Sequence, residues 1–60
     1  MQLKYEIRID GDSVLEPLSN EKQVESLAKR LKALNPDKSV QIAVIEIQEK
    51  TVEIREIEHQ

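Results

Sequence analysis

Few side chains in this 60-residue chain could perform acid–base, nucleophilic or metal chemistry. The sequence contains one histidine, one glycine and no cysteine. His59 could act as a general base or a metal ligand beside Glu56 or Glu58, but it belongs to a charged tail, and a catalytic group must be held rigidly. One glycine cannot form a glycine-rich phosphate-binding loop. We therefore expect no enzyme activity, no cofactor and no metal centre.

Two carboxylates flank the single glycine. Asp10 and Asp12 surround Gly11 and could bind a cation weakly. A calcium loop needs further oxygen ligands and a glutamate at a fixed distance along the chain, and this sequence does not place them there. Asp-Gly is instead a strong signal for a tight hairpin turn, so the pattern favours a turn over a cation site.

Two sets of charged residues, one basic and one acidic, could recognise other macromolecules. Lys22, Lys29 and Lys32 line one outer face of a predicted helix and could contact phosphates. The net charge of −3 weakens this interpretation, and Tyr5, the single aromatic residue, provides no stacking platform. An acidic cluster could dock a basic partner, although such runs are usually solvated surface. Its members are Glu46, Glu49, Glu53, Glu56 and Glu58.

The apolar composition predicts a small folded domain over residues 1–60. Isoleucine, valine and leucine supply 18 of the 60 residues, while phenylalanine and tryptophan are absent. Disordered chains are poor in β-branched residues, so this content favours a packed core. No apolar run approaches the roughly 20 residues of a membrane span. The charged N-terminal segment does not resemble a signal peptide, and we expect a cytoplasmic protein.

The first part of the chain predicts a hairpin. Apolar and charged residues alternate over 3–9, as expected for a strand with one buried face. After the Asp10-Gly11 turn, residues 13–16 could form a short return strand at the edge of the sheet. Pro17 limits this strand because proline cannot donate a hydrogen bond to a neighbour. The alternative is that residues 13–18 form only a loop.

Residues 21–34 predict the helix. Their apolar positions follow helical spacing and form one stripe, which consists of Val24, Leu27, Ala28, Leu31 and Leu34. Ser19 or Asn20 can cap the N-terminus, and Asn20 with Gln23 has the spacing of a capping box. The helix should end before Pro36, because the residue preceding proline is excluded from helical geometry.

The remaining sequence predicts two more strands. Residues 39–47 are rich in β-branched side chains, and alternation resumes over 51–57. A single long strand, or a helix over 49–58, remains an alternative for the last segment. The favoured fold is α+β, with element order ββαββ. We expect a four-stranded antiparallel sheet of spatial order 2-1-3-4, with the helix packed on one face.

The strand over 40–47 is apolar on both faces. Val40, Ile42 and Val44 point one way, whereas Ala43, Ile45 and Ile47 point the other. One helix can cover only one face, so the second set would form an exposed patch together with Ile57, unless the opposite face meets the helix. Exposed apolar patches mark interfaces. The alternative is a β-bulge that returns Ile45 or Ile47 to the core.

These observations favour a noncatalytic protein–protein interaction module, expected to form a homodimer through the second sheet face or a sheet edge. The predicted interface residues are Ala43, Ile45, Ile47 and Ile57. The alternative is a small nucleic-acid-associated regulator that uses Lys22, Lys29 and Lys32. An enzyme ranks third, because it would need an active site shared across a dimer and the sequence offers no evident nucleophile or base.

Overall fold

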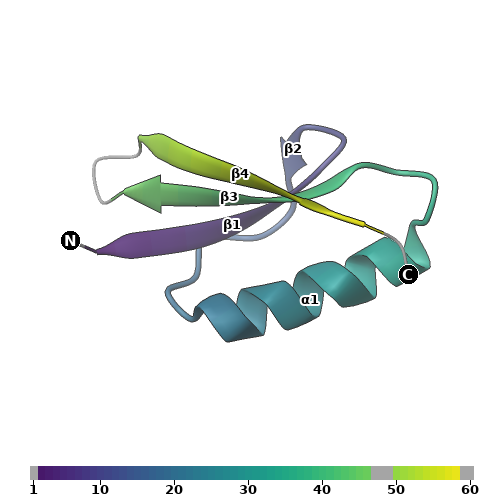
Figure 1. Cartoon of the computed structure of the whole chain (residues 1–60), viewed down its shortest axis with the longest axis horizontal. Helices are drawn as coiled ribbons and strands as arrows, with labels where there is room; N and C mark the ends of the chain where they lie inside the picture. Colours follow the sequence, from purple (N-terminus) through teal and green to yellow (C-terminus); the bar gives the residue numbers. More distant parts are fainter. Residues whose placement is uncertain (1, 47–49, 59–60) are drawn as a thin grey trace.

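A computed structural model describes residues 2–46 and 50–58 of the chain. Along the sequence the elements are β1 (Leu3–Ile9), β2 (Asp12–Ser13), α1 (Glu21–Leu34), β3 (Val40–Glu46) and β4 (Thr51–Ile57). The strands form one antiparallel sheet of order β2-β1-β3-β4, and the helix lies along one side of it (Figure 1). The predicted α+β fold and strand order are therefore confirmed.

The first hairpin turns through Asp10 and Gly11, as predicted. Asp10 has φ of 51° and Gly11 has φ of 87°, and Ile9 pairs directly with Asp12. Two central residues with positive φ are typical of a type I′ turn, whose twist matches that of the flanking strands. The turn is also tied to the residue preceding β3. The Asp10 carboxylate accepts a hydrogen bond from the Ser39 amide at 3.1 Å, and the Asp10 amide donates to the Ser39 carbonyl at 2.9 Å.

The return strand is shorter than the predicted 13–16, because β2 ends at Ser13. One further hydrogen bond joins the Val14 amide to the Ile7 carbonyl at 3.0 Å. The chain then leaves the sheet and returns at Leu18, which exchanges backbone hydrogen bonds of 2.7 and 2.9 Å with Tyr5. Pro17 has no amide hydrogen to donate, so a continuous ladder cannot run through it.

The helix spans the predicted residues. The Asn20 side chain accepts the Gln23 amide at 3.0 Å, which identifies Asn20 as the N-cap. Val24 and Ala28 are buried, but Leu34 is 73% exposed, so its predicted place in the core is wrong. At 3.6 residues per turn, Leu34 lies about 80° around the helix from Val24. This places Leu34 at the margin of the stripe.

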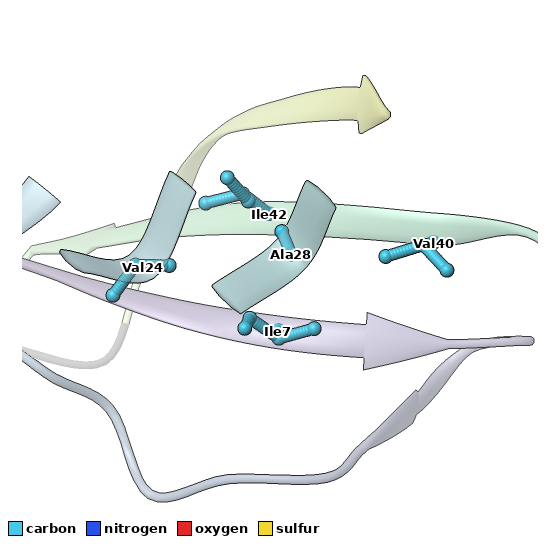
Figure 2. Packing of buried hydrophobic residues seen from close by; sticks show 5 residues of the cluster. All are labelled: Ile7, Val24, Ala28, Val40 and Ile42. Carbon is cyan, nitrogen blue, oxygen red and sulfur yellow. The ribbon is translucent and has the colours of Figure 1, made fainter. Parts of the chain in front are cut away.

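The core lies between the helix and the central strands. Figure 2 shows its five fully buried members, Ile7, Val24, Ala28, Val40 and Ile42. Ile7 of β1 pairs with Ile42 of β3, so the two largest side chains of this cluster lie side by side beneath the helix. The Val40 and Ile42 face of β3 therefore meets the helix, and the Ala43 and Ile45 face points away.

Residues 51–57 form a strand, so the alternative helix over 49–58 is wrong. The bulge expected as an alternative does occur, but the extra residue lies in β4. The register shifts between Val44 and Ile45, and Ile45 pairs with Thr51, which leaves Val52 as the inserted residue. Because β1 and β3 pair without interruption, with Lys4 opposite Ile45, the bulge does not return Ile45 to the core.

Candidate interaction surface

The outer face, meaning the side of the sheet turned away from α1, has a charged half and an apolar half. The charged half belongs to β1, where the Arg8 Nε lies 2.7 Å from the Glu6 carboxylate. The apolar half belongs to β3 and β4. Val52 precedes Glu53, which faces the helix side, so alternation along β4 places Val52 on the same face as Ile54. We call Ile45, Val52 and Ile54 the apolar strip. Val52 and Ile54 are 46% and 44% exposed, and Ile45 is half-buried.

The predicted interface residues do not all belong to this strip. Ala43 lies on the outer face but has no exposed surface. It pairs with Glu6 on one side and with Ile54 on the other, and both carry longer side chains than its methyl group. Ile45 lies on the outer face as predicted. Ile47 lies outside the residues that the structure describes.

Ile57 lies on the opposite face from the one predicted. It pairs with Val40 and packs against the buried cluster beneath the helix. The residue of β4 that faces outward beside Ala43 is Ile54. Alternation within one strand indicates which residues share a face, but it does not indicate which face of the neighbouring strand they join. The exposed members Val52 and Ile54 were missed for this reason.

The strip borders the free edge of the sheet, because β4 is an outermost strand. The Tyr5 backbone bonds to Leu18, on the side of β1 away from β3. Backbone groups of successive residues point to alternate neighbours in an antiparallel sheet. Because the Tyr5 backbone groups point away from β3, those of its partner Val44 point away from β1 and toward β4, where Val44 pairs with Glu53. Along β4 the direction alternates, so the N–H and C=O groups of Ile54 and Glu56 point away from the sheet.

Arg55 organises the helix-facing side of β4. Its Nη1 lies 2.6 Å from a Glu21 carboxylate oxygen and 3.4 Å from one of Glu25, both on α1. Its Nε donates to the Glu53 carboxylate at 2.6 Å, and the guanidinium carbon lies 5.9 Å from the centroid of the Tyr5 ring. The hydrogen bond to Glu53, followed by that to Glu21, raises the pKa of Arg55 above its ordinary value.

The predicted lysine face is only partly available. Lys22 and Lys29 are exposed on the helix, seven residues apart, which corresponds to about 10 Å along its axis. Lys32 is engaged within the chain, because its Nζ donates to the Lys38 carbonyl at 2.6 Å and lies 3.4 Å from the Pro36 carbonyl. It therefore holds the turn after the helix.

The acidic cluster does not form one continuous surface in the described part of the chain. Glu53 lies on the helix side and pairs with Arg55, whereas Glu56 lies on the outer face and accepts a hydrogen bond from the Gln41 side chain. Glu49 lies outside the described residues. Because the sheet separates Glu53 from Glu56, a single basic partner could not contact both side chains on one face.

The remaining candidates for chemistry stay isolated. Asp10 uses its carboxylate to accept the Ser39 amide, and His59 lies outside the described residues. Within residues 2–46 and 50–58, no three histidine, cysteine or acidic side chains gather closely enough to hold a metal ion. The helix of the described chain is also not long and apolar enough to cross a membrane.

Comparison with known proteins gives no family assignment: no family model matches the chain, and no curated protein or solved structure matches it at a significant level.

Proposed function

We propose that this chain is a noncatalytic protein–protein interaction module of the cytoplasm that associates with itself through β4 and the outer face. One observation carries the proposal: the exposed side chains of Val52 and Ile54 lie beside the free edge of the sheet. Removing apolar surface from water favours association. Backbone groups along the edge can form a ladder with a second strand at the same time.

The two edges of the sheet differ in how far they are protected. Natural sheets block unwanted pairing with proline, charged side chains, bulges or very short edge strands. The β2 edge has two residues in its strand, and Pro17 follows before the chain rejoins at Leu18. The β4 edge has seven residues, Thr51–Ile57, without proline; a bulge interrupts it near its start, and its charged residues, Glu53, Arg55 and Glu56, include both signs. The β4 edge is therefore the better template for pairing.

The alternative, binding of nucleic acid through Lys22, Lys29 and Lys32, has less support. Lys32 already donates to backbone carbonyls, and Glu21 and Glu25 lie on the same helix. A salt titration separates the two functions, because phosphate contacts weaken steeply with ionic strength. Binding of a DNA or RNA duplex at low salt that disappears as salt rises would favour this alternative over the interaction module.

The test compares two valine substitutions in the full chain. Val52 and Val14 are 46% and 45% exposed, but they lie at opposite edges of the sheet. Val52→Glu and Val14→Glu make the same chemical change at equal exposure, so they form a matched pair. Sedimentation equilibrium from about 1 µM to about 1 mM covers association free energies of roughly −8 to −4 kcal/mol.

We expect the unmodified chain and Val14→Glu to dimerise equally well, and Val52→Glu to weaken the dimer at least tenfold. Circular dichroism checks that both variants are folded. A monomer across the whole concentration range would contradict self-association. Equal weakening by both substitutions would remove β4 as the interface.

A further inference from the structure

The charges of β4 are arranged so that the strand is complementary to a second copy of itself. Glu53 and Arg55 flank Ile54, and both lie on the helix side of the sheet. When a two-fold axis relates two antiparallel copies of a strand, the residue just before the axis in one copy lies opposite the residue just after the axis in the other. With Ile54 on the axis, Glu53 of each copy lies opposite Arg55 of the other.

Backbone geometry limits the alternatives. Hydrogen-bonded pairs must form between residues whose N–H and C=O groups point outward, which Ile54 and Glu56 do. With the axis at Ile54, Ile54 pairs with its own copy and Glu56 lies opposite Val52, the residue of the bulge. Moving the axis by one residue keeps the same alternation of outward groups and gives the two nearest competing registers. An axis at Glu53 places that carboxylate opposite its own copy, and an axis at Arg55 does the same for the guanidinium. Like charges directly opposite each other destabilise a sheet.

The surroundings of Arg55 favour the same register. Its Nε and Nη1 contact carboxylates of its own chain, while Nη2 makes no hydrogen bond to the described residues. A guanidinium offers five donors in a planar fork, so Nη2 can bind a further carboxylate. The register that brings two Glu53 side chains directly opposite one another offers neither carboxylate such a donor and is disfavoured.

The outer face gains from the same arrangement. With Ile54 on the axis, the Ile54 side chains of the two copies become neighbours about 5.5 Å apart at Cα. The two apolar strips then meet at Ile54 in the new eight-stranded sheet, while Val52 of each copy lies opposite Glu56 of the other. A face-to-face dimer would instead cover the charged half, which includes Lys4 and the Glu6–Arg8 ion pair. Edge pairing leaves those charges in water.

We infer that two copies of this chain pair β4 with β4 in antiparallel orientation, with the two-fold axis at Ile54 and Glu53 of each copy against Arg55 of the other. This inference rests on the self-association proposed above and adds its register.

Cysteine cross-linking tests the register directly, because the natural chain contains no cysteine. Single variants Glu53→Cys, Ile54→Cys and Arg55→Cys are oxidised with glutathione disulfide and analysed by nonreducing electrophoresis and mass spectrometry. A disulfide needs Cα atoms within about 7 Å. The proposed register satisfies this at position 54, whereas neighbouring registers favour position 53 or 55. We expect Ile54→Cys to cross-link at least tenfold faster than the other two variants.

Sedimentation of the unmodified chain separates failure of the register from failure of the proposed function. A dimer whose fastest cross-link forms at position 53 or 55 overturns the register and leaves self-association standing. A dimer in which none of the three variants cross-links overturns β4 pairing. A strict monomer overturns both proposals.

A charge reversal gives an independent measurement. Glu53→Arg places arginine opposite Arg55 in the proposed register and should weaken the dimer about tenfold. Glu16→Arg makes the same change in net charge at an exposed position between β2 and α1, and should leave the dimer unchanged. Equal dimer affinity in the two variants would contradict the Glu53–Arg55 pairing.

Discussion

At the scale of single residues, Arg55 joins the edge strand to the helix. Its guanidinium contacts Glu21 and Glu25 on α1 and Glu53 on β4. Each contact is partly exposed, so each one alone contributes little, whereas a planar fork that holds several carboxylates can contribute more. Its positive charge is constant across the usual pH range, because these carboxylates raise the pKa of Arg55 further above an already high value.

We therefore predict that Arg55→Lys lowers the free energy of unfolding by about 1 kcal/mol, because one ammonium group cannot reproduce this geometry. Urea denaturation measures the loss, and about 1 M salt should reduce it by screening the ion pairs. Arg30→Lys is the control, since Arg30 is exposed and forms no ion pair with the described residues. A loss that does not depend on salt would argue against an electrostatic role for Arg55.

Gly11 is the residue where backbone conformation matters most. Its φ is 87°, and a Cβ added there would meet no atom within 4 Å, so any cost of substitution comes from the backbone itself. We predict that Gly11→Ala destabilises the fold by about 1–2 kcal/mol. Gly11→Asn should cost less, because asparagine tolerates positive φ. Thermal unfolding of both variants tests this order, and equal losses would contradict it.

At the scale of elements, the close approach of α1 to the sheet depends on a small side chain. Ala28 is completely buried between the helix and the sheet, beside Ile7 and Ile42 (Figure 2). We predict that Ala28→Leu destabilises the fold by about 1–3 kcal/mol, because the added atoms must displace packed neighbours. Ala33→Leu is the control at an exposed helix position, where the change should be nearly neutral. Urea denaturation of the pair measures the difference.

Elements defined by local signals could be predicted from the sequence. The helix begins after a capping asparagine, Asn20, and ends just before Pro36, and both signals act within a few residues. The Asp10-Gly11 turn is equally local, since its residues adopt the positive φ that the turn requires. The core stripe followed from helical spacing, except for Leu34 at its margin.

The candidate surface could be predicted only in part, because it depends on pairing between strands. The two apolar faces of β3 indicated a surface that the helix cannot cover, and Ile45 was found in this way. Ile57 was assigned to the wrong face because the register of β4 against β3 is set across the sheet, and the inserted residue at Val52 shifts it. Neither the register between the strands nor the position of the inserted residue can be recognised from the sequence of one strand.

At the scale of the whole molecule, the size of the chain links its stability to its association. A domain of about 60 residues buries a limited share of its surface and is only marginally stable. Any partner that binds the folded chain but not the unfolded one adds to its stability by mass action. For a self-associating protein the partner is the chain itself, so its own concentration becomes a stabilising factor.

The melting temperature should consequently rise with protein concentration. A tenfold increase changes the free energy of a dimer by about 1.4 kcal/mol, or about 0.7 kcal/mol per chain. In a domain of this size, 1 kcal/mol shifts the melting temperature by about 4–8 °C, so each tenfold step above the dimer dissociation constant should raise it by about 3–6 °C. Scanning calorimetry of the unmodified chain should show this rise. Val52→Glu should move this rise to at least tenfold higher concentration, whereas Val14→Glu should leave it where it is in the unmodified chain, because only Val52 borders the β4 edge. A melting temperature independent of concentration in all three proteins would mean that the folded chain gains no stability from its own copies.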